Sequence, residues 1–367
     1  MKIGFRRHRR HRFIPAVVAA TLLLAFLPEA FGAQRTFVSG SGVDSGSCSF
    51  PAPCRSFANA LTHTDPGGEI IVVDAAGYGS VTISQSVSII APQGVYAGIS
   101  VFAGFDGVVV NGAGVKVTLK GLSVNGQGGN NGINFVQGAR LAIDGCTASA
   151  MSAHGIVATA ANSVLTIADT VVRDNAQNGI QIAGTVQGTI VRSRSETNNS
   201  IGINVADGAR IVLTDSVVVN NGFNNVWAQS NVAATTSLAA DRLVARGTGG
   251  GVVATAIASG GKTFVHVTRS NLSEGAVGMQ VNGVGASGTV TASLTDSLIA
   301  HNGNVGISML AAPTLAWTFT ASGNRIVDNA AAGISNFGSG ILRTRTDNTV
   351  TGNSPESSGA LSPLLPI

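Results

Sequence analysis

The sequence is poor in charged and in aromatic residues. Asp, Glu, Lys and Arg make up 11% of its 367 residues and Phe, Trp and Tyr only 5%, whereas 48 residues are glycine. Most of the hydrophobic 44% is therefore small or aliphatic. This composition is typical of a fold built from many short strands and tight turns.

Cysteine is almost absent, and its placement excludes a zinc module. The chain has three cysteines, with neither a CxxC pair nor a Cys/His cluster at the spacing of zinc ligands. Cys48 and Cys54 bracket the segment CSFPAPC, and export to an oxidising compartment predicts a local disulfide there; the alternative is two free thiols. Cys146 stands where neighbouring repeats carry Thr or Ser, which indicates a small buried side chain. We expect no metal and no cofactor.

The basic residues are crowded at one end of the chain. Six of the 22 Lys and Arg residues lie before Phe13, and the apolar run FIPAVVAATLLLAFLP and the segment PEAFGAQ follow them. A basic segment, an apolar run and a cleavage region with small residues are the parts of a secretory signal peptide, which we predict at residues 1–33. A membrane anchor is the alternative, although the run is shorter than the roughly 20 residues that span a bilayer.

Removal of this leader changes the charge balance. The net charge is +4 and the isoelectric point about 9.3, but the leader holds six of the 22 basic and one of the 18 acidic residues, so 16 basic and 17 acidic side chains remain. A nearly neutral chain lacks the electrostatic footprint of a nucleic-acid-binding protein. We therefore expect an exported protein, periplasmic or extracellular, with no nucleic-acid partner and no membrane span after cleavage.

Glycine followed by an aliphatic residue recurs along the chain. Intervals of 23, 24 and 23 residues separate the first four pairs and intervals of 27, 28 and 27 the last four; the glycines are Gly132, Gly155, Gly179, Gly202, Gly251, Gly278, Gly306 and Gly333. The gap of 49 between the two groups holds one coil in which Val226 replaces the glycine. Apolar residues alternate within each repeat, and the LxxLxL pattern of leucine-rich repeats is absent. About three strands per repeat predict an all-β solenoid.

Asparagine stands four residues before most of these glycines. The asparagines are Asn175, Asn198, Asn302 and Asn329, with Met151 and Glu274 as exceptions. Asn tolerates the left-handed backbone that a tight turn requires, and its amide can bond the same amide in the coils above and below. We expect an asparagine ladder at this position, and we expect the glycine to supply a positive φ at the next corner.

Together these features resemble the right-handed parallel β-helix proteins of the pectin-lyase-like superfamily. The resemblance covers most of residues 35–355, and the segment from RTFVSG to SVSII is similar to the opening of many exported bacterial members. It implies a single-stranded β-helix of about ten coils at residues 69–353, a cap at residues 34–68 in which RSFANAL suits a short helix, and a mobile tail at residues 354–367. The superfamily includes polysaccharide lyases, glycoside hydrolases and uronate epimerases, so the fold alone does not choose an activity.

The catalytic signatures of those enzymes are missing. The nearest match to the Gly-His-Gly of polygalacturonases is Ala153-His154-Gly155, and the Asp-Pro-His segment that uronate epimerases share does not occur. A column of charges stands about ten residues before each repeat glycine: Asp144, Asp169, Arg192, Asp215, Asp241, Arg269 and Asp296. Asp169, Arg192 and Asp215 are the catalytic candidates, with carboxylates for calcium or acid chemistry and Arg as base or clamp. The alternative is a solvated edge in which Arg relieves repulsion between Asp residues.

Three functions therefore compete. The first is a non-catalytic surface or glycan-interacting β-helix whose partner is a polysaccharide or cell-surface glycan, with Trp227 as the candidate binding residue. The second is a lyase, hydrolase or epimerase that acts on an acidic polysaccharide through the charged column, with calcium if it is a lyase. The third is a structural spacer or adhesin-like rod. Exposure of Trp227 and Trp317 separates a binder from a spacer, and a shared groove for Asp169, Arg192 and Asp215 separates an enzyme from a binder.

Overall fold

The structure is a computed structural model that describes Met1 and residues 33–283, 287–310, 314–338 and 340–363. The predicted signal peptide falls almost entirely outside these residues. The compact unit begins at Ala33, where the first strand starts. Among the described residues, no helix is both long and apolar enough to pass through a membrane.

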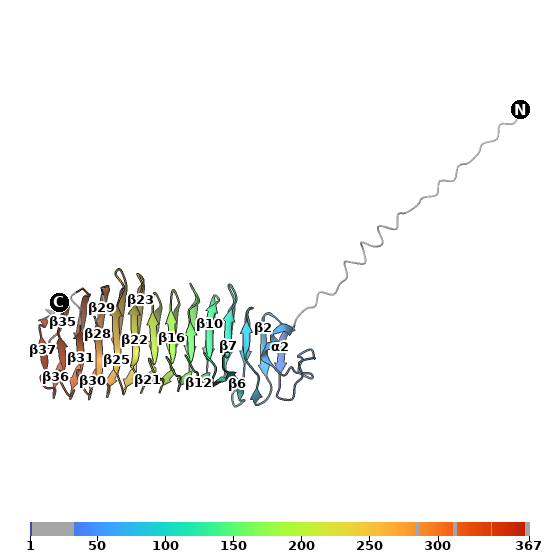
Figure 1. Cartoon of the computed structure of the whole chain (residues 1–367), viewed down its shortest axis with the longest axis horizontal. Helices are drawn as coiled ribbons and strands as arrows, with labels where there is room; N and C mark the ends of the chain where they lie inside the picture. The colour runs from blue at the N-terminus through green and yellow to red at the C-terminus, as the bar shows by residue number, and fades with distance from the viewer. Residues whose placement is uncertain (2–32, 284–286, 311–313, 339, 364–367) are drawn as a thin grey trace. The chain divides into compact units, whose positions relative to one another are not determined.

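In the described residues, three parallel sheets are built from strands that stack coil upon coil (Figure 1). The chain visits the first, third and second sheets in turn and makes about 11 turns. The first sheet has 14 strands: β1 (Ala33–Val38), β2 (Thr64–Val72), β5 (Val87–Ile90), β8 (Lys116–Lys120), β11 (Arg140–Asp144), β14 (Val164–Ala168), β17 (Gln187–Val191), β20 (Arg210–Thr214), β23 (Thr235–Asp241), β26 (Lys262–Thr268), β29 (Thr289–Thr295), β32 (Ala316–Ser322), β35 (Ile341–Thr344) and β38 (Ser362–Pro363). The second has 12: β4 (Val81–Ile83), β7 (Val108–Asn111), β10 (Ile133–Gln137), β13 (Ile156–Ala158), β16 (Ile180–Ala183), β19 (Ile203–Ala206), β22 (Asn224–Ser230), β25 (Gly250–Ala256), β28 (Val277–Asn282), β31 (Ile307–Leu310), β34 (Ile334–Asn336) and β37 (Ser357–Gly359). The third also has 12: β3 (Ala76–Gly77), β6 (Ala97–Phe102), β9 (Leu122–Gln127), β12 (Thr147–Ser149), β15 (Val171–Arg173), β18 (Arg194–Glu196), β21 (Val217–Val219), β24 (Val244–Arg246), β27 (Asn271–Ser273), β30 (Leu298–Ala300), β33 (Arg325–Val327) and β36 (Thr349–Thr351).

Alternation along each strand fills the inside of the coils with aliphatic side chains. In the second sheet Ile156, Ile180 and Ile203 lie in register on successive strands, and each is at most 2% exposed. Burial of such a side chain stabilises the fold by about 1.5–3 kcal/mol. Val226 continues the same stack, so the residue that replaces the repeat glycine is Asn225, and not Val226 as predicted.

The repeat glycines are required for close packing rather than for a positive φ. Gly155, Gly179 and Gly202 all have negative φ, so the prediction of a left-handed backbone at these glycines was wrong. A Cβ added at Gly179 would lie 2.3 Å from Oγ of Ser195 and 2.7 Å from the carbonyl oxygen of Gly202. At Gly179, neighbouring coils approach one another too closely for a side chain.

The asparagines form buried ladders beside these glycines. Nδ2 of Asn175 donates to Oδ1 of Asn198 over 2.8 Å, and Nδ2 of Asn198 donates to Oδ1 of Asn221 over 2.9 Å. A second ladder, joined by bonds of 2.8 Å, runs through Asn302, Asn329 and Asn353. Each amide thereby satisfies polar groups that are shielded from water.

The left-handed backbone of this turn belongs to the residue before the ladder position. Thr197 has a φ of 52° and precedes Asn198, so the prediction that placed the left-handed residue at the asparagine was wrong. Glu274 was predicted as one of two exceptions to the ladder. It is the left-handed residue of its turn, and Gly275 takes the ladder position, where its N–H donates to Oδ1 of Asn302. Counting back from the repeat glycine failed there because the turn length differs between coils.

A short cap precedes the first coil. α2 (Phe57–His63) follows Ser56, whose Oγ accepts a hydrogen bond from the N–H of Asn59 over 3.2 Å, as is usual for an N-cap. The helix packs against β1, β2 and β4 through its buried residues Phe57, Ala60 and Leu61. This placement agrees with the helix predicted at RSFANAL.

The two ends of the solenoid differ from the predicted boundaries. β2 begins at Thr64, so it takes in the Pro66-Gly67 turn that we had assigned to the cap. At the other end β37 and β38 pair with β34 and β35, so the coils continue into the segment after residue 353 that was predicted as a mobile tail. The open edge of the preceding coil offers backbone partners to this segment, although it is rich in Ser and Pro.

Candidate functional site

The predicted charged column lies at the corner that follows the first sheet. Asp169, Arg192 and Asp215 each come one residue after a strand of that sheet, with φ values of 49°, 47° and 51°. The prediction was wrong in two coils, because Gly145 and Arg242 occupy the corner there, one residue after Asp144 and Asp241. The number of residues between this corner and the repeat glycine varies, so counting alone misplaces the column.

The corner residues pair with one another. Arg192 donates from Nε and Nη2 to the two carboxylate oxygens of Asp169, over 2.8 and 2.6 Å. Asp215 is held instead by Arg242, whose Nη2 donates to it over 2.7 Å. Sequence reasoning missed Arg242 because it directly follows Asp241, which was taken as the member of the column in that coil. The three candidates are therefore split between two ion pairs rather than gathered in one groove.

This pairing moves the pKa values away from what acid–base catalysis needs. The hydrogen bond from Arg192 holds the pKa of Asp169 below its usual range, and the hydrogen bond from Arg242 does the same for Asp215. The bond to Asp169 also raises the pKa of Arg192. Asp169 is thus a weak base and Arg192 stays protonated, and the carboxylates of Asp169 and Asp215 already accept hydrogen bonds from arginines. All three side chains are exposed, so the pairs add little stability.

A second polar region lies on the outer face of the second sheet. Asn134, Gln181, Asn204 and Trp227 occupy equivalent outward positions on β10, β16, β19 and β22, with Val157 on β13 between the first two. These side chains form a single row because their strands pair in register. The row crosses the direction of the strands and runs from coil to coil.

Side-chain amides in this row are joined by hydrogen bonds. Nδ2 of Asn178 donates to Oε1 of Gln181 over 2.7 Å, and Nδ2 of Asn204 donates to the same oxygen over 2.9 Å. Nε2 of Gln229 donates to Oδ1 of Asn204 over 3.1 Å. Each bond but the first links one coil to the next, so the amides are held in fixed positions, with Asn178 and Asn204 buried and Gln181 and Gln229 half-buried.

The network continues toward the cap through a histidine and a carboxylate. Asp106 accepts hydrogen bonds from Nδ2 of Asn131 over 2.9 Å and from Nδ2 of Asn134 over 2.7 Å. Oδ1 of Asn131 accepts the N–H of His154 over 3.3 Å, and Nδ1 of His154 accepts the N–H of Asn178 over 3.1 Å. Burial lowers the pKa of His154, so its ring is neutral at neutral pH.

We refer to the connected residues as the polar row: Asp106, Asn131, Asn134, His154, Asn178, Gln181, Asn204 and Gln229. The row extends over six successive strands of the second sheet, from β7 to β22, which is about 24 Å at a strand spacing of about 4.8 Å. Sequence reasoning missed it. The available signal was an amide two residues after the repeat glycine in Gly132-Ile133-Asn134, Gly179-Ile180-Gln181 and Gly202-Ile203-Asn204.

The two tryptophans lie in different environments. Trp227 is half-buried on the outer face, next to the polar row, and its ring centroid is 5.5 Å from that of Phe223, which is 53% exposed. Nε1 of Trp227 donates to Oγ1 of Thr255 over 3.3 Å, which fixes the ring. Trp317 is only 3% exposed and belongs to the core. Trp227, and not Trp317, is therefore in a position to contact a ligand.

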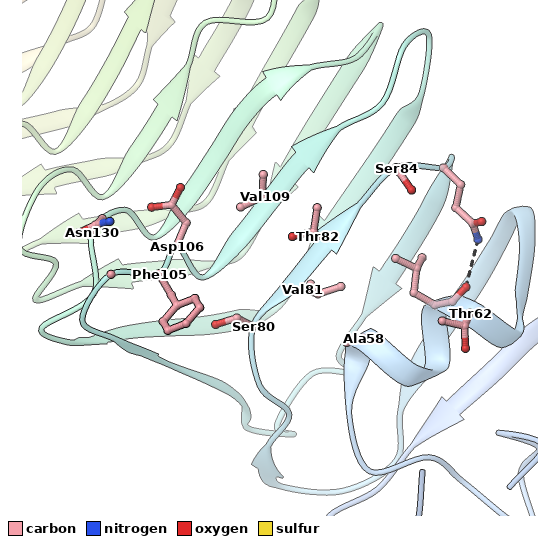
Figure 2. Close-up of a pocket in the computed structure, with 13 residues that line it drawn as sticks. Ala58, Thr62, Ser80, Val81, Thr82, Ser84, Phe105, Asp106, Val109 and Asn130 are labelled. Atoms are coloured by element: carbon pink, nitrogen blue, oxygen red, sulfur yellow. Dashed lines mark hydrogen bonds between the residues drawn. The ribbon is translucent and has the colours of Figure 1, made fainter. Parts of the chain in front are cut away.

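A cleft of about 720 Å³ opens at the end of the polar row nearest to the cap (Figure 2). α2 forms one wall, and Thr82 and Val109 contribute outward side chains from β4 and β7. Figure 2 shows Phe105 and Asp106 across the cleft from α2. Val109 pairs in register with Asn134, so the cleft and the polar row form one continuous surface.

One group of metal-ligand side chains occurs among the described residues, namely Cys48, Cys54 and His63 in the cap. Cys48 and Cys54 are joined in a disulfide, with their Cα atoms 4.6 Å apart. Neither sulfur is therefore a thiolate that could bind a metal.

Comparison with known proteins decides the type of solenoid. The model of the right-handed β-helix region matches residues 75–239. The chain folds as a right-handed parallel β-helix. The predicted single-stranded, all-β architecture is thus confirmed.

Solved structures with this fold include carbohydrate enzymes. The β-helix is similar to the A-module of the mannuronan C-5 epimerase AlgE4 of Azotobacter vinelandii, with 16% identity and a TM-score of 0.57 over 80% of this chain and 91% of the module. It is also similar to the pectate lyase Pel9A, with 13% identity and a TM-score of 0.49 over 90% of this chain and 79% of the lyase. Identities this low show a shared fold alone. No curated protein matches the sequence.

Proposed function

We propose that the protein is an exported, non-catalytic β-helix that binds a polysaccharide along the polar row and the adjoining cleft. The observation that carries this proposal is the continuous line of amides between Asp106 and Gln229. Amide side chains both donate and accept hydrogen bonds, as sugar hydroxyls do. Successive strands stand about 4.8 Å apart, comparable with the length of one sugar residue in a linear chain. A glycan that lies along the row meets a new coil at about every residue.

Aromatic rings at both ends of this surface support the same ligand. Trp227 and Phe223 lie at one end and Phe105, which is 66% exposed, lies in the cleft at the other. An aromatic ring offers a flat apolar face to the apolar face of a sugar ring, while neighbouring polar groups bind the hydroxyls.

Export is supported by the leader and by the cap. The basic and apolar segments of residues 1–33 have the order of a secretory signal peptide, and the Cys48–Cys54 disulfide suits an oxidising compartment. A glycan outside the cytoplasm is then an accessible partner.

Binding of the mature protein to a panel of soluble polysaccharides, measured by affinity electrophoresis, tests the proposal. We expect at least one polysaccharide to retard the protein. Trp227→Ala should weaken the binding about fivefold, because a stacking contact contributes about 1 kcal/mol. Asn204→Ala should also weaken it, since Asn204 bonds to both Gln181 and Gln229. Phe264→Ala removes a ring that is 41% exposed on the first sheet, and this matched control should bind normally.

The same panel, incubated with and without calcium, tests the enzymatic alternative. Ultraviolet absorbance detects the unsaturated products of a lyase, and an assay for reducing ends detects hydrolysis. Product formation that is lost in Asp169→Ala or Arg192→Ala would contradict a non-catalytic role. Failure of every polysaccharide to bind would contradict the proposal as a whole.

A further inference from the structure

The second sheet differs from the other two sheets in its charge. In the described residues, none of its 12 strands contains Asp, Glu, Lys, Arg or His. The first sheet, by contrast, presents Lys116, Arg140 and Arg210 on its strands, and the third presents Arg173 and Arg194. An uncharged face of this length is therefore a property of one side of the coil and not of the whole molecule.

The loops beside this sheet add one charge to the proposed binding surface. Among the residues of the polar row and the lining of the cleft, Asp106 is the one carboxylate, and no Lys or Arg occurs. The histidine of the row, His154, uses Nδ1 to accept the N–H of Asn178, which requires an unprotonated nitrogen. The surface is thus neutral to slightly negative.

This charge pattern discriminates between classes of sugar. A uronate polymer carries a carboxylate on every residue, and binding would remove water from these groups without offering a guanidinium or ammonium in return. Asp106 would add like-charge repulsion at the cleft. The hydroxyl groups of an uncharged sugar, in contrast, find both donors and acceptors in the amides.

We infer that the ligand is an uncharged polysaccharide, an inference that rests on the proposed function. The glycan chain crosses strands β7 to β22 along the polar row. One sugar ring packs on Trp227, and the end of the chain nearest to the cap enters the cleft beside Phe105.

Matched pairs of oligosaccharides that differ only in oxidation of the primary hydroxyl test this inference. Cello-oligosaccharides are compared with oligoglucuronates, and manno-oligosaccharides with oligomannuronates, by titration calorimetry with the mature protein at low salt. We expect the uncharged member of at least one pair to bind at least about tenfold more tightly than its acidic counterpart, because an unpaired charge is costly to desolvate.

The outcomes separate this inference from the proposed function. Equal or tighter binding of the acidic member, lost in Trp227→Ala, would overturn the inference and leave glycan binding at this surface intact. Lack of binding by both members of every pair would count against the proposed function itself.

A charge variant gives a second, independent measurement. Gln229→Lys places a cation at the edge of the polar row. We expect this variant to bind the acidic oligosaccharide of each pair more tightly, and so to show a smaller preference for the uncharged one. Gln187→Lys places the same charge on an exposed position of the first sheet and should leave the preference unchanged. Equal responses of the two variants would show that the ligand lies elsewhere and would overturn the inference.

Discussion

At the scale of single residues, Asn198 shows how one buried amide joins three coils. It is 1% exposed, its Oδ1 accepts from Asn175 in the preceding coil, and its Nδ2 donates to Asn221 in the following one. The amide of Asn198 fills the corner beside Gly179, where an added Cβ would lie 2.6 Å from its Nδ2. The ladder therefore stabilises the solenoid and takes no part in the proposed binding surface.

Replacement of Asn198 by Ala should lower the free energy of unfolding by about 2–4 kcal/mol, because it leaves the buried N–H and Nδ2 of Asn175 without their acceptor. Urea denaturation followed by circular dichroism measures the change. Asn199→Ala, one residue further along, removes an exposed amide and should cost far less. Similar losses in the two variants would contradict the role assigned to the ladder.

At the scale of elements, α2 and the loop before it act together as the cover of the first coils. Asp44 accepts a hydrogen bond from the N–H of Arg55 over 2.8 Å and one from Oγ of Ser56 over 2.9 Å, and so fixes the start of the helix. Nδ2 of Asn59 lies 3.0 Å from Sγ of Cys54, which ties the helix to the disulfide. The same helix forms a wall of the cleft (Figure 2), so the cap shapes the binding surface as well as the end of the sheet.

Removal of the disulfide by replacing Cys48 and Cys54 with Ser should destabilise this cap. The cysteines are six positions apart, and closing so short a loop stabilises a fold by about 2 kcal/mol. Hydrogen exchange should accelerate in β1 and α2 but not in the central strand β16, because a repeat protein unfolds locally from its ends. Wild-type protein treated with a reductant should behave in the same way. Unchanged exchange in α2 would contradict this prediction.

At the scale of the whole molecule, stability should depend on pH through its carboxylates. Several have pKa values below the ordinary 3.8, among them Asp74, which accepts hydrogen bonds from Oγ of Ser39, the hydroxyl of Tyr78 and the N–H of Gly40. A carboxyl group with a lowered pKa stabilises the folded state fully above its unfolded pKa, and this contribution is lost as the pH falls through the folded value.

We therefore expect the urea midpoint of the wild-type protein to fall steeply as the solution is acidified below about pH 4. Asp74→Asn should be less stable at neutral pH and should lose less stability on acidification. Parallel pH profiles for the two proteins would contradict the assignment to Asp74. His154 also lowers the stability on acidification, but at higher pH. Its pKa in the folded protein is below the ordinary 6.5, so the unfolded state binds the proton more readily once the pH falls below that value.

The amino-acid sequence determined the fold of this protein. The repeat period, the alternation of apolar residues and the glycines and asparagines at the turns are local features, and each reports directly on strand, corner or core. They were sufficient to predict an all-β solenoid, and the resemblance that they carry implied the single-stranded parallel β-helix and the short helix now seen at Phe57–His63. They were insufficient at the ends, where pairing with the preceding coil decided the structure.

Only the tertiary structure decided which side chains meet. Gln181 and Asn204 are 23 positions apart and Asp215 and Arg242 are 27, and each pair is brought together by the stacking of two coils. Turn length differs from coil to coil, so a count back from the repeat glycine does not find Arg242. Register in a parallel sheet is set by the backbone pairing of whole strands, and that pairing, rather than any local pattern, assembled the uncharged surface to which we assign glycan binding.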